Sequence, residues 1–245
     1  MTVMATSPDE TLSWRDRAVA RSLEQARRRA EGQSARFVKA ALDVVEETGA
    51  EDFTIQAVVE RSRASTRTFY QHFAGKDDLL VAMFEEAERL SVVRLRPIVD
   101  AASDPVARLR AFIVGRQLVS RPTPLALLLV NHHLRLQQSR PEELRLAFEP
   151  VVGYLRDLVR DAQDAGAIPP GDPTVVAGVV LQTVVTFIHA QLLGSALTDW
   201  EASPEEVADF VLLGIGAAPA RSGPLLPGRR EELERDVVRV AERQA

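Results

Sequence analysis

The sequence contains no cysteine, and only 5% of its residues are aromatic. Without cysteine there are no disulfides, thiolate zinc sites or cysteine nucleophiles, and the composition fits a reducing, cytoplasmic setting. The first residues, MTVMATSPDETLSW, lack a basic stretch followed by an apolar one, so we expect no secretion signal. No alternating strand pattern survives along the 245 residues. The sequence therefore predicts an all-α protein.

Signs of catalysis are also missing. The chain has no glycine-rich phosphate loop, no spaced set of metal ligands and no convincing pair of nucleophile and base. The neighbouring histidines His132 and His133 would point about 100° apart on a helix, which disfavours a shared metal ion. We therefore expect no enzyme, no cofactor and no metal.

One apolar segment tests whether the protein is soluble. The run VVAGVVLQTVVTFIHAQLL, residues 175–193, is nearly long enough to span a bilayer, but several polar side chains interrupt it. A helix covered by protein on two sides is also apolar nearly all round. We interpret the run as a central buried helix rather than a membrane span.

Charge is distributed unevenly. The chain carries a net charge of −5, yet residues 11–39 hold eight basic and three acidic residues, a local net charge of +5. Such a basic flank is typical of a contact with a polyanion, although a solvated helix surface has the same pattern. Residues 1–33 contain too few bulky apolar side chains for a core of their own, and we expect them to form an arm that is mobile or weakly helical when free.

Three short helices follow the arm. Apolar residues at helical spacing from Phe37 to Val45 predict the first, which Gly49 ends. Thr54 is a suitable N-cap for a second helix, IQAVVERS, and Ser65 for a third, TRTFYQHF. The tight turn RAS, residues 63–65, joins the second and third helices. This arrangement predicts a helix-turn-helix over residues 34–80.

The third helix concentrates three of the few aromatic residues. Phe69 and Phe73, four positions apart, are expected to face inward, while Tyr70 presents a polar tip outward. Its first turn has no acidic residue, which favours an anion such as a phosphate near the helix start, and Arg67 could reach base edges in a major groove. Lys76 opens the next helix, where a cation is unfavourable unless an anion lies nearby.

These residues resemble the N-terminal DNA-binding domain of the TetR family of transcriptional regulators. The match runs from Phe37 to Leu80 and includes a motif similar to T-[LF]-Y-x-[HY]-F-x-x-K, matched between Thr68 and Lys76. The resemblance implies an all-α dimer that binds an operator in double-stranded DNA, with a divergent helical domain that often binds a small ligand. The DNA-binding candidates are Thr54, Arg63, Ser65, Thr66, Arg67, Thr68, Tyr70, His72 and Lys76. By resemblance, Thr54, Tyr70, His72 and Lys76 contact phosphates, and Ser65, Thr66 and Arg67 approach bases.

Arg63 departs from the family pattern, in which glycine is common at this point of the turn. Either the backbone there does not need a positive φ, or the arginine tolerates the strain. In both cases its side chain is a candidate for a DNA contact. Both alternatives stay open from the sequence.

The remaining chain predicts a larger ligand-binding and dimerisation domain over residues 81–218, then a linker and an amphipathic helix over residues 219–245. Prolines in the segments SDP, RPTP, SRP, AIPPGDP and ASP each introduce a helix. Polar groups among apolar helices could orient an effector, and the candidates are Phe112, Arg116, His132, Tyr154, Gln182, Thr186 and His189. We interpret His189 first as a hydrogen-bonded core residue, with a contact to the effector as the alternative.

The function expected from the sequence is a dimeric DNA-binding regulator, a repressor released from its operator by a small molecule. The alternative is a helical enzyme or carrier whose basic flank binds an acidic partner.

Overall fold

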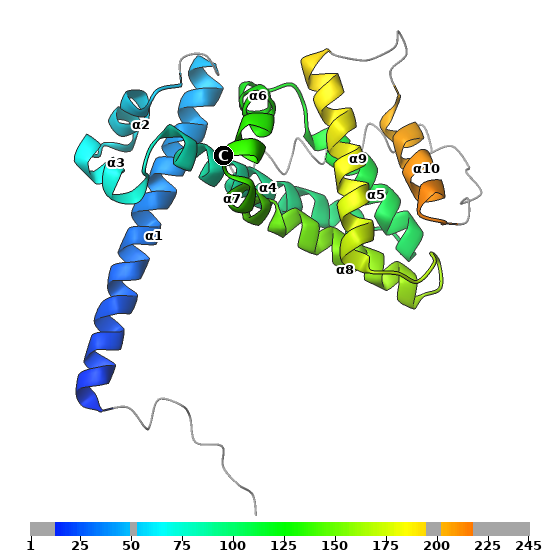
Figure 1. The fold of residues 1–245 in the computed structure, drawn as a ribbon, viewed down its shortest axis with the longest axis horizontal. Coiled ribbons are helices and arrows are strands. Elements are labelled where there is room, and N and C mark those ends of the chain that lie inside the picture. The colour runs from blue at the N-terminus through cyan, green and yellow to red at the C-terminus, as the bar shows by residue number, and fades with distance from the viewer. Residues whose placement is uncertain (1–12, 50–52, 195–201, 218–245) are drawn as a thin grey trace, which may run out of the picture.

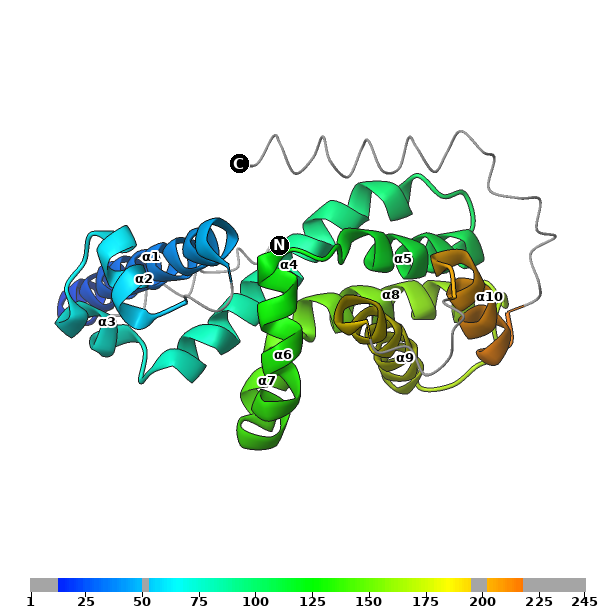
Figure 2. The same ribbon diagram turned by 90° about the horizontal axis from the view of Figure 1, so that it is seen from above.

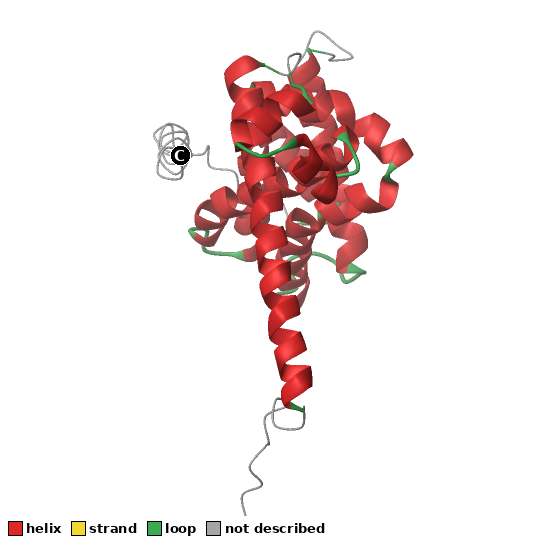
Figure 3. Cartoon of the chain, turned by 90° about the vertical axis from the view of Figure 1, so that its left-hand side faces the viewer, coloured by secondary structure: helices red, strands yellow, loops and turns green. Residues whose placement is uncertain are grey.

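The computed structural model describes residues 13–49, 53–194 and 202–217, and all ten elements in these ranges are helices (Figure 3). They are α1 (Trp14–Thr48), α2 (Ile55–Ser62), α3 (Thr66–His72), α4 (Lys76–Asp100), α5 (Pro105–Val119), α6 (Pro124–Ser139), α7 (Pro141–Ala147), α8 (Glu149–Asp164), α9 (Pro173–Leu193) and α10 (Pro204–Gly214). The all-α prediction is confirmed. The predicted linker and tail helix at residues 219–245 lie outside the described residues, as do the first twelve residues of the arm.

Five helices begin with a proline, as the sequence predicts, and Pro150 is the second residue of a sixth, α8. Pro105, Pro124, Pro141, Pro173 and Pro204 each occupy the first turn of their helix. Proline suits this place because its φ is already helical and its missing N–H would have no partner within the helix. In four of the five cases the preceding residue caps the helix with its side-chain oxygen, as Ser203 does for α10.

The first helix is much longer than expected. The sequence predicts an arm over residues 1–33 that precedes the first helix, but α1 begins at Trp14, where the Ser13 hydroxyl accepts a hydrogen bond from the Asp16 N–H. Arg27, Arg28 and Arg29 therefore lie inside the helix and not before it. Residues 13–32 are all exposed, and this part of α1 extends away from the rest of the molecule (Figure 1). An independent core is unnecessary here, because the buried half of α1 has already nucleated the helix and each added residue only propagates it.

Two hydrophobic cores lie along the chain, and α4 takes part in both. The first packs α1, α2 and α3 with the start of α4, and it includes Leu128, Leu129 and Leu136 of α6 and Leu144 and Ala147 of α7. The second packs the rest of α4 with α5, α8, α9 and α10. Seen from above, α6 and α7 lie between the two halves of the molecule (Figure 2). The domain boundary expected at residue 80 therefore falls inside a continuous helix.

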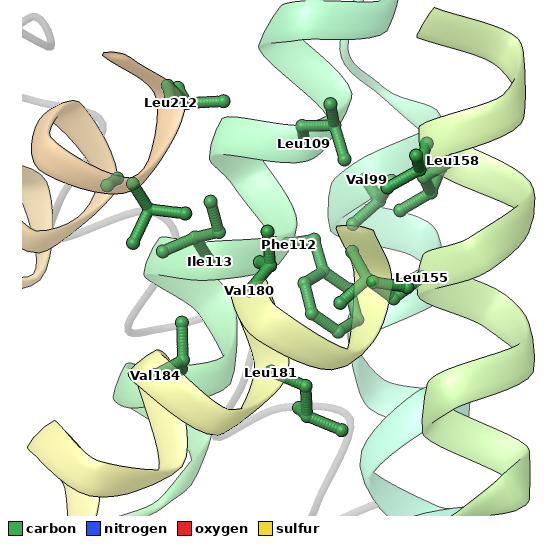
Figure 4. Close-up of a cluster of buried hydrophobic side chains, with 14 of the residues drawn as sticks. Val99, Leu109, Phe112, Ile113, Leu155, Leu158, Val180, Leu181, Val184 and Leu212 are labelled. Atoms are coloured by element: carbon green, nitrogen blue, oxygen red, sulfur yellow. The ribbon is translucent and has the colours of Figure 1, made fainter. Parts of the chain in front are cut away.

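In the second core, the Phe112 side chain lies among aliphatic side chains of neighbouring helices (Figure 4). Leu155 and Leu158 come from α8, Val180 and Leu181 from α9, and all are buried. This core holds the C-terminal half of the described chain together.

Within the described part of the chain, helix α9 is buried on one face only. The cover on a second side that the sequence predicts would therefore have to come from outside these residues. Ala177, Val180, Leu181, Val184, Val185 and Ile188 pack inward, whereas Val175 and Val179 of the other face are 61% and 60% exposed. Within the described residues α9 alone has the length and apolar composition that a membrane span requires. Its inward face is part of the second core, as in a helix of a folded domain.

Candidate nucleic-acid interface and effector residues

The turn between α2 and α3 resolves the question that Arg63 raised. Arg63 adopts a left-handed conformation with φ 52° and ψ 37°, and it is the only non-glycine residue with positive φ in the described ranges. The N–H groups of Arg63 and Ala64 donate to the carbonyls of Glu60 and Val59, at 3.1 Å and 3.2 Å, which closes the end of α2. The turn thus requires a positive φ, and an arginine with an exposed side chain accepts it.

Phenylalanine rings fix the angle of α3. Phe69 and Phe73 are buried, as predicted, and both meet the buried Phe37 of α1 edge to face, with ring centroids 5.4 Å and 6.1 Å apart. The Phe69 and Phe73 rings stack on each other at 5.4 Å. Such edge-to-face and stacked pairs favour particular orientations beyond simple burial. The aromatic anchors therefore hold one face of α3 against α1.

The opposite face of α3 carries the base-reading candidates. The Ser65 hydroxyl accepts from the Thr68 N–H at 3.0 Å and lies 2.8 Å from the Thr68 hydroxyl, so Ser65 caps the helix as expected. Ser65, Thr66 and Arg67 are exposed together, Thr68 is partly exposed, and Tyr70 is 56% exposed. The structure therefore presents a row of polar and cationic side chains on a rigidly packed helix.

Three of the expected phosphate contacts already have partners inside the protein. The Thr54 hydroxyl caps α2 by accepting from the Ala57 N–H at 3.1 Å. His72 Nδ1 lies 3.0 Å from the Ser34 hydroxyl of α1. Lys76 Nζ donates to the Phe53 carbonyl at 2.7 Å and lies 4.7 Å from the centroid of the Phe53 ring. Burial lowers the pKa of Lys76, and the Arg135 charge adds to that effect.

Ion pairs join the start of α4 to α6 and α7. Both oxygens of Asp77 accept from Arg135 of α6, at 2.7 Å and 2.8 Å. Asp78 accepts from the Ala74 N–H directly after α3, at 2.9 Å, and from Arg140, at 2.9 Å. The Arg135 guanidinium lowers the pKa of Asp77. The exit of α3 is therefore connected to α6 and α7 by charged hydrogen bonds.

The arginines on the exposed part of α1 differ in whether they form ion pairs within the described residues. Arg27 pairs with Glu31 at 2.7 Å, and Arg28 pairs with Glu24 at 2.8 Å, both across one helical turn. Arg29 has no such partner in the part of the chain that the structure describes. Exposed pairs of this kind are weak, so a phosphate could compete for their arginines.

The seven effector candidates do not form one cluster. Four of them face the protein interior. The Phe112 and Tyr154 rings meet edge to face at 5.9 Å, Arg116 forms a buried ion pair with Glu88 at 2.7 Å, and the His189 ring lies 5.0 Å from that of His133. Burial raises the pKa of Tyr154 to about 12, which keeps its hydroxyl neutral.

The other three candidates point elsewhere. His132 lies beside Arg135, with its Nδ1 3.3 Å from the guanidinium, and Gln182 and Thr186 are exposed on α9. The spacing could not separate His132 from His133, because each lies one helical turn from buried leucines of α6. On α9, the nearly continuous apolar sequence does not indicate which face is buried.

Sequence reasoning missed Glu88 and His133. Glu88 is 6% exposed on α4, one turn from both Phe84 and Val92, which are themselves buried. A carboxylate on the apolar face of a helix was the signal that could have identified it. Among the described residues no group of three or more histidine, aspartate or glutamate side chains is arranged to hold a metal ion.

Comparison with known proteins agrees with this geometry. Residues 37–83 match the family model for bacterial regulatory proteins of the tetR family. Comparison with curated proteins gives no match.

Three solved structures illustrate the likeness in fold. The fatty acid degradation regulator FadR from Bacillus halodurans is 19% identical, with a TM-score of 0.55 over 74% of this chain and 98% of its own. RolR in complex with resorcinol is 16% identical, with a TM-score of 0.57 over 86% and 96%. A TetR-family regulator from Rhodococcus sp., described as putative, is 22% identical, with a TM-score of 0.53 over 75% and 96%.

Proposed function

Because the chain carries the DNA-binding domain of the TetR family of transcriptional regulators, we propose that it is a cytoplasmic repressor that a small molecule releases from its operator. The observation that carries this proposal is the exposed row Ser65, Thr66 and Arg67 on a helix whose other face is held by Phe69 and Phe73. An arginine on a rigid helix suits bidentate recognition of guanine in the major groove, and the neighbouring hydroxyls suit phosphates or bases.

The proposed repressor acts as a homodimer through α9 and α10. Val175, Val179 and Phe187 of α9 are exposed, and so are Phe210 and Leu213 of α10, which are 69% and 58% exposed. A second chain that placed the same two helices against these faces would complete a four-helix interface. The two recognition helices, α3 of each chain, would then meet successive major grooves about 34 Å apart, or a multiple of that distance, on a roughly palindromic operator.

Release by an effector requires a connection between the two cores. Helix α4 supplies one, because it takes part in both cores. The ion pairs of Arg135 with Asp77 and of Arg140 with Asp78 tie its first turn, at the exit of α3, to α6 and α7. Likeness in fold to RolR with resorcinol, and to FadR from Bacillus subtilis with stearoyl-CoA, supports a small-molecule effector as part of the proposal. An effector shifts DNA affinity only if it binds the two arrangements of these helices unequally.

A mobility-shift titration tests DNA binding. The purified full chain should shift DNA from upstream of its own gene in the presence of excess competitor DNA, at nanomolar concentration near physiological salt. The alternative, a helical enzyme or carrier with a basic flank, predicts equal loss of every labelled fragment to the competitor. Equal competition would therefore reject the proposal in favour of non-specific polyanion binding.

Analytical ultracentrifugation tests the dimer. Phe210→Asp or Val179→Asp would place a charge in the proposed interface and should shift the protein from dimer to monomer at micromolar concentration. Leu23→Asp is the matched control, since Leu23 is also exposed, at 66%, but lies on the extended part of α1. A wild-type monomer under these conditions would contradict the proposed assembly.

A further inference from the structure

A small group of ionisable side chains lies where the two hydrophobic cores meet. We define the polar junction as Glu88 of α4, Arg116 of α5, His133 of α6 and His189 of α9. On α4, Phe84 belongs to the first core and Val92 to the second, and Glu88 lies midway between them. The His133 ring contacts Phe84 and Phe148, with centroids 5.9 Å and 5.5 Å away. The junction therefore bridges the DNA-binding half and the half that would sense an effector.

The ion pair at the centre of the junction is buried but incompletely bonded. Arg116 Nη2 donates to Glu88 Oε1 at 2.7 Å, and the two side chains are 10% and 8% exposed. Arg116 Nη1 donates to the Ser120 hydroxyl at 3.1 Å. Arg116 Nε and Glu88 Oε2 are shut off from solvent without any hydrogen-bond partner. A buried pair with unmet hydrogen bonds is a costly arrangement, because desolvation is offset only by complete pairing.

The unused Nε–H points to a particular ligand chemistry. Nε and Nη2 form one edge of the guanidinium, and a carboxylate can accept from both at once with two parallel hydrogen bonds. Glu88 uses only one of the two donors. A ligand carboxylate that approached this edge squarely would satisfy both donors, and Glu88 would lose its partner.

We propose that Arg116 is the anchor for the carboxylate of an organic-acid effector, which replaces Glu88 on the guanidinium edge. This inference rests on the proposed function and specifies the chemical class of its effector. His133 and His189 are partly exposed, while Arg116 and Glu88 are buried. The acid enters past the two imidazole rings, and its apolar part lies against the neighbouring rings of Phe84 and Phe148.

Charge balance gives the proposal a distinctive signature. Burial raises the pKa of Glu88, and only the Arg116 charge and hydrogen bond oppose that effect. Once displaced, Glu88 loses this opposition and takes up a proton. The two histidines of the junction are neutral near pH 7, since burial and the His189 charge lower the pKa of His133 to about 4, and burial and the Arg116 charge lower the pKa of His189. A bound carboxylate raises the pKa of both imidazoles, so these rings are the alternative proton acceptors.

Displacement of Glu88 from Arg116 also affects α4, the helix that follows α3. Glu88 is part of α4, whose first turn holds Asp77 and Asp78, the partners of Arg135 and Arg140. Loss of the bond between α4 and α5 at Glu88 frees α4 to shift against α5. The same residue is therefore the counter-ion in the unliganded state and the link through which an acid weakens operator binding.

Calorimetric titration of the full-length protein tests the effector class. Benzoate and octanoate are the probes, and benzamide and octanamide are matched controls of the same shape without the charge. We expect at least one carboxylate to bind, its amide to bind about 10- to 100-fold more weakly, and about one proton to be taken up per carboxylate in a comparison of buffers. No binding of either carboxylate at millimolar concentration, equal binding of the amides, or no proton uptake would overturn the proposal.

Two variants test the residues. Glu88→Gln removes the competing carboxylate and should tighten benzoate or octanoate binding. The double variant with Arg116→Gln and Glu88→Gln replaces the ion pair by two neutral amides of similar shape, which keeps the fold, and it should lose about 10- to 100-fold in carboxylate affinity. Carboxylate affinity unchanged in the double variant, with an unchanged thermal midpoint, would show that Arg116 is structural only. A mobility shift without ligand tests the proposed function separately, so the two failures are distinguishable.

Discussion

The two cores of this molecule are built from different side chains. The core around the recognition helix contains five phenylalanines, Phe37, Phe53, Phe69, Phe73 and Phe84. The core of the second half consists almost entirely of valine, leucine, isoleucine and alanine, with Phe112 and Tyr154 as its aromatic members. Paired rings prefer a few defined orientations, whereas aliphatic side chains repack with little loss of stability.

This difference fits the separate demands on the two halves. The helix proposed to contact DNA, α3, must keep one orientation, and the phenylalanine rings around it hold that orientation. The second half must adopt two arrangements if an effector is to change DNA affinity. It keeps a buried ion pair with unmet hydrogen bonds and uncovered apolar faces on α9 and α10. The rigidly packed DNA-binding half around α3 is thus joined to a second half that has fewer orientation-specific contacts.

The largest expected effect is the loss of stability when a buried phenylalanine is truncated. Phe69 and Phe112 are both fully buried, one in each core, and Phe→Ala at either position should lower the free energy of unfolding by about 3–5 kcal/mol. Chemical denaturation followed by circular dichroism measures both losses. A loss below about 1 kcal/mol at Phe69 would contradict its role as an anchor.

The milder substitution Phe→Leu separates the two cores, because it keeps most of the volume but removes the ring. Phe69→Leu should weaken operator binding beyond the effect of lost stability, while Phe112→Leu should leave the operator affinity of the folded protein unchanged. Mobility shifts on both variants decide this. Equal loss of operator affinity would mean that ring geometry around α3 is not what positions the helix.

A smaller effect is expected at the exposed face of α3. Arg67→Ala should cost about 1–3 kcal/mol in operator binding and relax the preference at one operator position. Tyr70→Phe keeps the ring of an exposed side chain and removes one hydroxyl, so it should weaken binding evenly across sequences. Binding to a set of operators mutated one position at a time compares the two variants. Equal losses on operator and random DNA for both would remove Arg67 from the base-reading set.

Features of the fold that depend on local sequence could be predicted, whereas features that depend on tertiary packing could not. Thr54, Ser65, Phe69 and Phe73 could be placed from the sequence because capping and helical spacing are local. The length of α1 could not, since its exposed residues are helical only as a continuation of a buried segment. The pairing of Glu88 with Arg116 and of His133 with His189 joins residues distant in sequence. Which face of α9 turns inward also depends on such tertiary packing, which a nearly uniform apolar pattern does not indicate.

Deletion of the exposed part of α1 tests whether the DNA-binding surface extends beyond α3. If Arg27, Arg28 and Arg29 all contact phosphates, deletion of residues 1–30 should make the slope of log affinity against log salt shallower by about two to three per arm. Residues 14–33 of the arm belong to α1, so this part would lie along the DNA backbone as a rigid helix, rather than enter a minor groove as an extended chain.

Single substitutions refine the arm experiment. Arg29, which has no acidic partner in the described ranges, should contribute about 0.9 to the slope per arm, and Arg29→Ala measures it. Arg27→Ala should change the slope less than Arg29→Ala does, because Arg27 is already paired with Glu31. A deletion variant with unchanged operator affinity and unchanged slope would show that the arm is a solvated helix and not a DNA contact. Since residues 13–32 are exposed, the deletion should not change stability.

The smallest effect is expected at the turn, where stability and DNA binding should move in opposite directions. Arg63 has φ 52°, a conformation that costs a residue with a Cβ roughly 1 kcal/mol more than glycine. Arg63→Gly should therefore raise the free energy of unfolding by up to about 1 kcal/mol. Arg61→Gly is the control, because Arg61 lies inside α2 and pairs with Glu47, and glycine in a helix should cost about 1 kcal/mol. If the Arg63 side chain contacts DNA, the more stable Arg63→Gly variant should also bind the operator more weakly, which a mobility shift measures. A destabilised Arg63→Gly variant would contradict the conformation of the turn, and unchanged operator affinity would show that Arg63 serves only the backbone.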